Sequence, residues 1–249
     1  MIRISIHDLI PPIIPKAIRY INRSKGMANY HPFDQVPKSI KARLILDVGA
    51  NVGDVTVAAL KSYPECHVIC FEPVNSTFNI LEKRLKPYAH RVTVYNEALS
   101  SISGNTEINI TSFHGANSLS PQSSMHSALN PQVREIGKET ISMVRLDDIA
   151  RSFPNKTIDI MKIDVEGHEL DVIVGGKSFI QNNVDTIIVE ASLMRDLSWD
   201  DNQSILEVFQ LLSEMGFRLI NVYDLHYAKN SSLMCVQMDC VFRHKSKLS

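Results

Sequence analysis

The chain has 249 residues, 44% of them hydrophobic, and a formal net charge of −1 at pH 7. This is sufficient for one α/β domain with a short extension. The balanced charge lacks the basic footprint of nucleic-acid binding, and no apolar run approaches the roughly 18 residues of a membrane-spanning helix. Four cysteines without a CxxC pair, and no evident signal peptide, favour a reduced, cytoplasmic protein.

Residues Met1–Lys41 precede the domain predicted for 42–249. A proline cluster is followed there by apolar residues interspersed with basic ones, from Ile13 to Lys25. We expect an extension that packs on the domain or on a second subunit of an oligomer. The alternative is a weak contact with a membrane surface, without stable membrane binding.

The segment Arg43–Thr56 reads as a strand, a glycine turn and a helix. The apolar run from Leu44 to Val48 suits a parallel strand that is covered on both faces. Gly49 and Gly53 then mark a turn between the strand and the helix. Such a unit opens nucleotide-type folds, in which ligands bind at the carboxyl ends of the strands.

This turn does not suit a phosphate. The three positions of a dinucleotide-binding G-x-G-x-x-G hold Gly49, Asn51 and Asp54. Asn51 adds a side chain where a phosphate would approach, and Asp54 brings negative charge to the first helical turn. Asp47 at the strand end favours a ligand with a positive group or hydroxyls. S-adenosylmethionine (SAM) has a sulfonium, an amino group and a ribose diol.

A second buried strand, 66–72, ends in Glu72, about 25 residues after Asp47. A carboxylate at roughly this spacing meets ribose hydroxyls in dinucleotide-binding folds. It can accept hydrogen bonds from both hydroxyls of a diol. Asp47, Glu72 and the two glycines together therefore predict a nucleoside site.

Four segments resemble the FkbM family of SAM-dependent methyltransferases: DVGANVGDVT (47–56), FEP (71–73), NEAL (96–99) and KIDVEGHE (162–169). The resemblance covers Leu44–Glu190. It implies a class I methyltransferase fold, an α/β Rossmann-like architecture. Its mostly parallel sheet has seven strands, with an antiparallel C-terminal hairpin and helices on both faces. It also implies O-methylation of a sugar, glycan or related metabolite.

The remaining pattern predicts helices at 76–88, 169–175 and 203–215 and a short one from Leu146. It predicts strands at 91–96, 104–110, 141–145, 158–163, 184–190, 217–222 and 233–242. The long, polar and Ser-rich segment 111–140 is the expected substrate lid, since loops of this length are uncommon and often functional.

The motifs and the resemblance together assign cofactor contacts to Asp47, Gly49, Asn51, Gly53, Glu72, Pro73, Asn96, Glu97, Ala98, Ser118 and Asp164. Of these, the residues that follow the third strand (Asn96, Glu97 and Ala98) would meet the adenine.

Methyl transfer to a hydroxyl needs a general base. His168 is the first candidate because its ordinary pKa lies near neutrality, and Glu166 and Asp164 are the alternatives. In a metal-assisted version, Asp164 and Glu190, which end adjacent strands, would bind Mg²⁺, although a third ligand is not evident. The alternative functions are N- or carboxyl-methylation of a small metabolite and a non-catalytic SAM-binding role.

Overall fold

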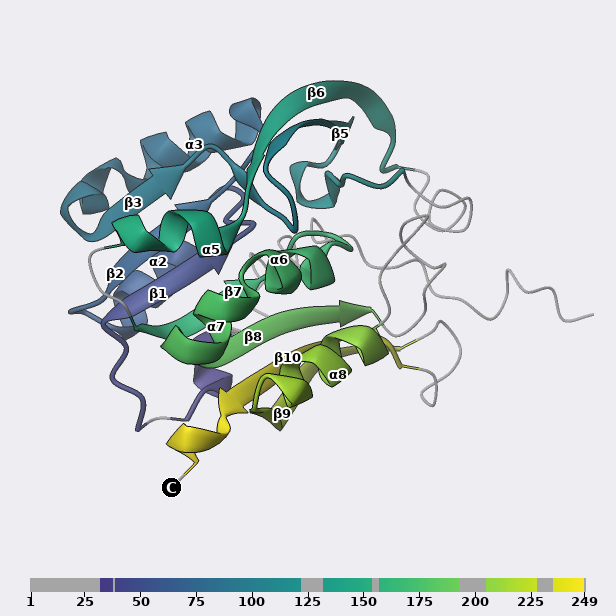
Figure 1. The fold of residues 1–249 in the computed structure, drawn as a ribbon. Coiled ribbons are helices and arrows are strands. Elements are labelled where there is room, and N and C mark those ends of the chain that lie inside the picture. Colours follow the sequence, from purple (N-terminus) through teal and green to yellow (C-terminus); the bar gives the residue numbers. More distant parts are fainter. Residues whose placement is uncertain are drawn as a thin grey trace, which may run out of the picture.

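The computed structural model describes residues 32–37, 39–121, 132–153, 157–192, 205–227 and 235–248. Its centre is a seven-stranded sheet in the order β3-β2-β1-β7-β8-β10-β9 (Figure 1). The strands are β1 (Leu44–Val48), β2 (His67–Phe71), β3 (Val92–Tyr95), β7 (Ile158–Ile163), β8 (Val184–Ser192), β9 (Phe217–Tyr227) and β10 (Cys235–His244). The first five in the spatial order are parallel, and β10 is antiparallel to both neighbours. The expected class I architecture is confirmed.

The apolar runs of the central strands explain their position. Every residue of β1 is buried, because helices cover both faces of the sheet there. Val48 pairs with Phe71 of β2 and with Ile163 of β7, so the three strands end together. The segments that follow these strands therefore meet at one edge, where α/β folds bind their ligands.

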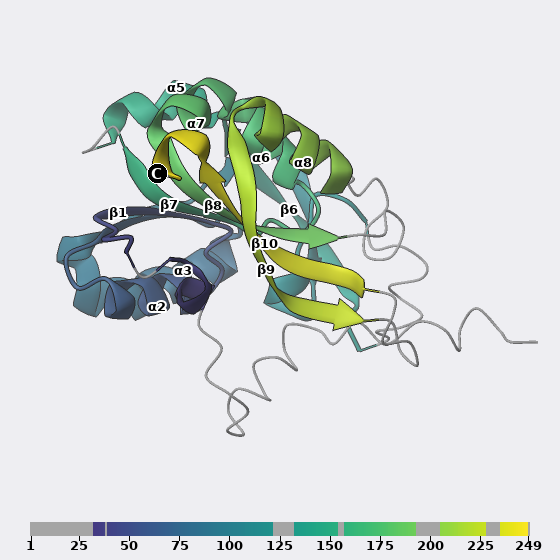
Figure 2. The same ribbon diagram turned by 90° about the horizontal axis from the view of Figure 1, so that it is seen from below.

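Two groups of helices enclose the sheet (Figure 2). One face packs against α2 (Asp54–Ser62) and α3 (Asn75–Leu85). The other packs against α5 (Leu146–Ile149), α6 (Glu169–Gly175), α7 (Lys177–Asn183) and α8 (Ile205–Glu214). Short 3₁₀ helices are η2 (Pro32–Gln35), η3 (Lys86–Arg91), η4 (His114–Ala116), η5 (Ala150–Ser152) and η6 (Lys245–Lys247).

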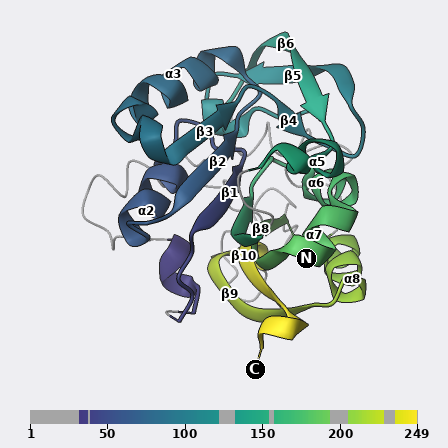
Figure 3. The same cartoon turned by 60° about the vertical axis from the view of Figure 1, so that its left-hand side comes forward.

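A small second sheet has the order β4-β6-β5 and consists of β4 (Ala98–Leu99), β5 (Gly104–Thr111) and β6 (Glu135–Val144) (Figure 3). The strand expected from Ile141 thus begins earlier, at Glu135. Its first half is polar and mostly exposed, and it lacks the alternation that predicts a half-buried strand. The segment 111–140, expected as a lid, is therefore partly β-structure, and its residues 122–131 lie outside the described part.

Of the extension expected at 1–41, residues 1–31 lie outside the described part of the chain. Phe33 and Val36 pack into the core on the α2 side. Within the described ranges, no helix combines the length and apolar character that crossing a bilayer requires. Cys66, Cys70 and Cys240 are buried and are not joined in disulfides.

Candidate functional site

A cavity of about 600 Å³ lies at the carboxyl edge of the main sheet. One side consists of the turn after β1 and the end of β2, and the opposite side of the segment after β7. The small second sheet adds the apolar side chains of Leu99, Ile108 and Ile141, and the segment after η4 adds Leu119. Of the sequence-predicted site residues, the cavity is lined by Gly49, Asn51, Glu72, Pro73, Glu97, Ala98, Asp164, Glu166 and His168.

The turn after β1 packs closely against the end of β7. Gly49 has a φ of 79°, and a Cβ atom there would lie 2.0 Å from the carbonyl oxygen of Asp164. The N–H groups of Gly49 and Ala50 both donate to the carbonyl oxygen of Phe71, at 3.0 and 2.9 Å. Only glycine fits at this position, which brings the ends of three strands to one point.

Glu72 presents a fixed carboxylate to the cavity. Its Oε2 accepts the N–H of Asn51 at 3.0 Å, and its Oε1 accepts the N–H of Val74 at 3.0 Å. Burial raises the pKa of Glu72 to about 7, although the two backbone hydrogen bonds oppose this shift. Each carboxylate oxygen keeps a lone pair for a further donor, such as a ribose hydroxyl.

Asp47, by contrast, lies beneath the turn and does not line the cavity. It is almost fully buried, and Thr56 Oγ1 donates to its Oδ2 at 2.5 Å. Burial raises the pKa of Asp47 to about 6 against the effect of this hydrogen bond. The position of its side chain supports the turn from below. Gly53, at the start of α2 with a φ of 86°, also lies outside the cavity lining.

Asn96 and Ser118 hold neighbouring segments in place and do not line the cavity. The Nδ2 of Asn96 donates to the carbonyl oxygens of Glu72 and Pro73, each at 3.0 Å. The Oγ of Ser118 donates to the carbonyl oxygen of Glu166 at 2.7 Å. Both residues thus fix the backbone from which cavity-lining side chains project.

The turn after β7 has a constrained backbone. Glu166 has a φ of 57°, a conformation that costs a non-glycine residue about 1–3 kcal/mol. The Oε1 of Glu169 accepts the N–H groups of Val165 and Gly167, both at 3.2 Å. Together with Ser118, Glu169 therefore holds Glu166 in a position where its side chain faces the cavity.

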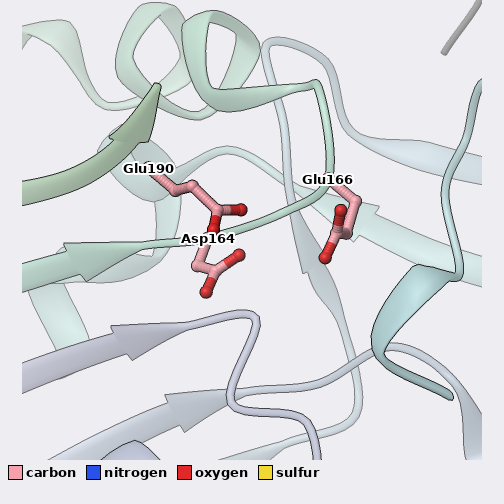
Figure 4. A group of neighbouring side chains, drawn as sticks. All are labelled: Asp164, Glu166 and Glu190. Atoms are coloured by element: carbon pink, nitrogen blue, oxygen red, sulfur yellow. The ribbon is translucent and has the colours of Figure 1, made fainter. Parts of the chain in front are cut away.

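Three carboxylates meet beside this turn. Asp164, Glu166 and Glu190 each offer an oxygen within 4.8 Å of the others, and Figure 4 shows their side chains approaching from the end of β7, the following turn and β8. Glu166 is the third acid that the sequence pattern did not identify as a partner of Asp164 and Glu190.

Lys162 supplies positive charge to this region. Its Nζ lies 3.1 Å from Asp239 Oδ1 and 3.7 Å from Asp164 Oδ2. Burial alone would lower the pKa of Lys162, but the carboxylates of Asp239 and Asp164 raise it above its ordinary value. The buried ammonium is therefore charged. From its position in the strand, Lys162 was expected to be structural, but its side chain lines the cavity. Its partner Asp239 is remote in the chain.

His168 precedes α6 and lines the cavity. Its Nδ1 lies 3.1 Å from Asp171 Oδ2, and its Nε2 lies 3.0 Å from Ser120 Oγ. Both ring nitrogens have side-chain partners, so the imidazole has a fixed orientation at the edge of the cavity.

His114 is a further cavity residue, and it belongs to no motif in the sequence. Its Nδ1 lies 2.7 Å from Asn51 Oδ1, which joins the segment after β5 to the turn after β1. Phe113 beside it also lines the cavity. A lone histidine in a long polar segment carries no signal that would place it here.

Comparisons with known proteins agree with this geometry. The model of the "Methyltransferase FkbM domain" matches residues 47–219. The hexuronic acid methyltransferase AglP of Haloferax volcanii is 30% identical over 149 residues, which are 59% of this chain and 55% of that protein. The 2-O-methyltransferase NoeI of Sinorhizobium fredii is 28% identical over 140 residues, 54% of this chain and 57% of that protein. This chain thus spans somewhat more than half the length of these two relatives.

The fold also has a solved counterpart. The crystal structure of methyltransferase FkbM from Methylobacillus flagellatus superimposes with a TM-score of 0.51 at 15% identity. The match covers 82% of this chain and 44% of that one. Because the family model spans most of the described domain, the chain belongs to the FkbM methyltransferase family.

Proposed function

We propose that this protein is a SAM-dependent methyltransferase that O-methylates a hydroxyl of a sugar, a glycan or a related metabolite. The observation that carries the proposal is the fixed carboxylate of Glu72. It lies in the wall of a cavity that extends to His168 and to the acidic turn after β7.

The residues of the cavity suit SAM in three places. Glu72 offers free lone pairs to the two ribose hydroxyls. Glu97 and Ala98 provide a polar group and a small side chain for the adenine, and the apolar walls of the second sheet exclude water from it. The turn from Gly49 to Asn51 would receive the amino-acid end. The sulfonium would then lie toward Asp164, where carboxylates outnumber the single ammonium of Lys162.

SAM supplies an electrophilic methyl group, and the protein aligns the acceptor and removes its proton. We assign proton removal to His168, which lines the cavity with a fixed ring orientation. Glu166 and Asp164 are the other groups of the same turn that face the cavity. The geometry supports a role for Mg²⁺ less well than one for His168. The Lys162 ammonium 3.7 Å from Asp164 would repel a divalent cation bound by that carboxylate.

The names of two relatives support a sugar as the methyl acceptor. AglP is named for a hexuronic acid and NoeI for 2-O-methylation. A sugar hydroxyl is compatible with a cavity that has carboxylates on one side and apolar walls on the other. Cys66, Cys70 and Cys240 are buried and are not joined in disulfides, which agrees with action in the cytoplasm.

The decisive experiment incubates the protein with methyl-labelled SAM and a panel of nucleotide sugars and extracted glycans. Label in a base-stable ether is the expected result. Label in a base-labile ester or in an amine would contradict methylation of a hydroxyl.

Binding is tested separately. S-adenosylhomocysteine should raise the melting temperature and NAD should not, because only ligands that bind the native state stabilise it. Glu72→Ala should abolish the shift, whereas the matched change at an exposed glutamate, Glu65→Ala, should preserve it. A shift that persists in Glu72→Ala would contradict the assignment of Glu72 to the ribose.

A further inference from the structure

Lys162 has hydrogen-bond donors that the described part of the protein does not satisfy. The residue is only 3% exposed, and it lines the cavity. Its ammonium has three N–H donors, but among the described residues it makes one hydrogen bond, to Asp239 Oδ1 at 3.1 Å. Its distance of 3.7 Å from Asp164 Oδ2 is too long for a good hydrogen bond. Because buried donors without acceptors are costly, an oxygen of a bound ligand would stabilise this ammonium.

The ammonium lies at the part of the cavity where the methyl acceptor should bind. Its Nζ lies between the carboxylates of Asp164 and Asp239, which both line the cavity. Asp239 is also the register partner of Glu190 at the end of β8. Glu72, the proposed ribose ligand, follows β2, which is separated from β7 by β1. Lys162 is therefore on the acidic side of the cavity, away from the proposed ribose site.

The charges around Nζ determine which kind of ligand atom suits it. The sulfonium of SAM is a cation, and the ammonium repels it. A ligand carboxylate or phosphate would be repelled by the acidic groups nearby, which are Asp164, Glu166, Glu190 and Asp239. A neutral hydroxyl oxygen meets neither repulsion, and it can accept a hydrogen bond from an N–H group.

We propose that Lys162 is a catalytic residue that donates a hydrogen bond to the oxygen of the methyl acceptor, an inference that rests on the proposed O-methyltransferase function. The hydroxyl proton passes to the base, which the proposed function places on His168. The oxygen bonds to the methyl carbon, the carbon–sulfur bond breaks and its electron pair stays on sulfur. Lys162 stays protonated throughout and stabilises the negative charge that develops on the oxygen. Such a fixed donor lowers the barrier most in a site that excludes water.

The competing explanation is that Lys162 only neutralises the buried carboxylate of Asp239. Lys162→Met removes the ammonium and should lower kcat by about 100-fold, as the loss of one donor to a developing oxyanion does. This variant also leaves the Asp239 carboxylate without its cation, which can prevent folding. The double variant Lys162→Met/Asp239→Asn removes both charges and so separates the two explanations. It should fold and remain about 100-fold slower than the wild type, whereas Asp239→Asn alone keeps an oxygen beside Nζ and should retain most of the rate.

The measurement is label transfer from methyl-labelled SAM to the acceptor that the panel identifies. Urea unfolding and the affinity for S-adenosylhomocysteine, which should match the wild type, show that the double variant is folded. A double variant with the wild-type kcat would overturn the role of Lys162 and leave the proposed function intact. A wild type that methylates an amine or a carboxyl group instead of a hydroxyl would overturn the proposed function, and the inference with it.

Discussion

The carboxylate of Glu72 accepts the backbone N–H of Asn51 at 3.0 Å, so the residue that follows β2 holds the turn after β1. Burial raises the pKa of Glu72 to about 7. Near neutral pH, part of the ligand-free protein is therefore protonated at the residue that we assign to the ribose. Two ribose hydroxyls that donate to Glu72 favour its ionised form.

This makes cofactor affinity dependent on pH. Below pH 7 the proton on Glu72 must leave before the diol binds. The affinity for S-adenosylhomocysteine should therefore rise by up to about tenfold per pH unit toward pH 7 and level off above it. Calorimetry at pH 6 in buffers of different ionisation enthalpy should detect release of a proton on binding. Glu72→Gln should bind weakly with a shallower pH dependence; a wild type that releases no proton at pH 6 would contradict the assignment.

Gly49→Ala should abolish S-adenosylhomocysteine binding. The added Cβ would lie 2.0 Å from the carbonyl oxygen of Asp164, so the ends of β1 and β7 must separate. Its positive φ alone should cost about 1–3 kcal/mol in the free energy of unfolding. Gly137→Ala is the matched control, because no atom of the described residues lies within 4 Å of the corresponding Cβ position. Thermal shift and urea unfolding measure both effects, and normal binding by Gly49→Ala would contradict the close approach.

Thr56→Val should destabilise the fold by about 1–3 kcal/mol, because it leaves the buried Asp47 carboxyl without its hydroxyl partner. Thr186 is also fully buried, but its Oγ1 has no hydrogen-bond partner among the described residues. The same change there, Thr186→Val, should be neutral or stabilising. Urea unfolding compares the two variants; equal effects would show that the Thr56 hydroxyl contributes nothing to stability through Asp47.

Turnover should survive EDTA and should not increase with Mg²⁺. The ammonium of Lys162 already lies beside Asp164 and Asp239, so the carboxylates have a cationic partner from the chain itself. The measurement is label transfer to the identified acceptor before and after dialysis against EDTA. Activity that is lost on dialysis and restored by Mg²⁺, but not by Na⁺, would contradict this prediction.

Much of the fold could be predicted from local patterns. The apolar runs at 44–48 and 158–163 mark strands buried on both faces, and Gly49 marks the turn. The start of β6 could not be predicted. Its first half, 135–140, is mostly exposed and has no buried face, so apolar and polar side chains do not alternate there. Its pairing with β5 joins two strands that a long segment of the chain separates.

The site, too, could be predicted only where local patterns determine it. Positions after parallel strands, such as Glu72 and Asp164, were predictable because strand ends converge on one edge. The sequence alone could not predict whether the side chain at such a position faces the ligand or the core. Asp47 points toward Thr56 under the turn, and no spacing in the sequence distinguishes this from a cavity position. His114 and Asp239 reach the cavity only through tertiary packing.

The surplus of carboxylates over ammonium beside the cavity has a consequence for turnover. A sulfonium cofactor enters as a cation and leaves as an uncharged thioether. The attraction toward the acidic groups therefore weakens as the methyl group is transferred, while the proton taken from the acceptor stays on the protein. The acidic groups would thus attract the sulfonium of SAM more strongly than the uncharged thioether of S-adenosylhomocysteine. The loss of charge in the reaction would therefore favour release of S-adenosylhomocysteine and binding of a new SAM molecule. The groups involved are Lys162 and its acidic neighbours Asp164, Glu166, Glu190 and Asp239.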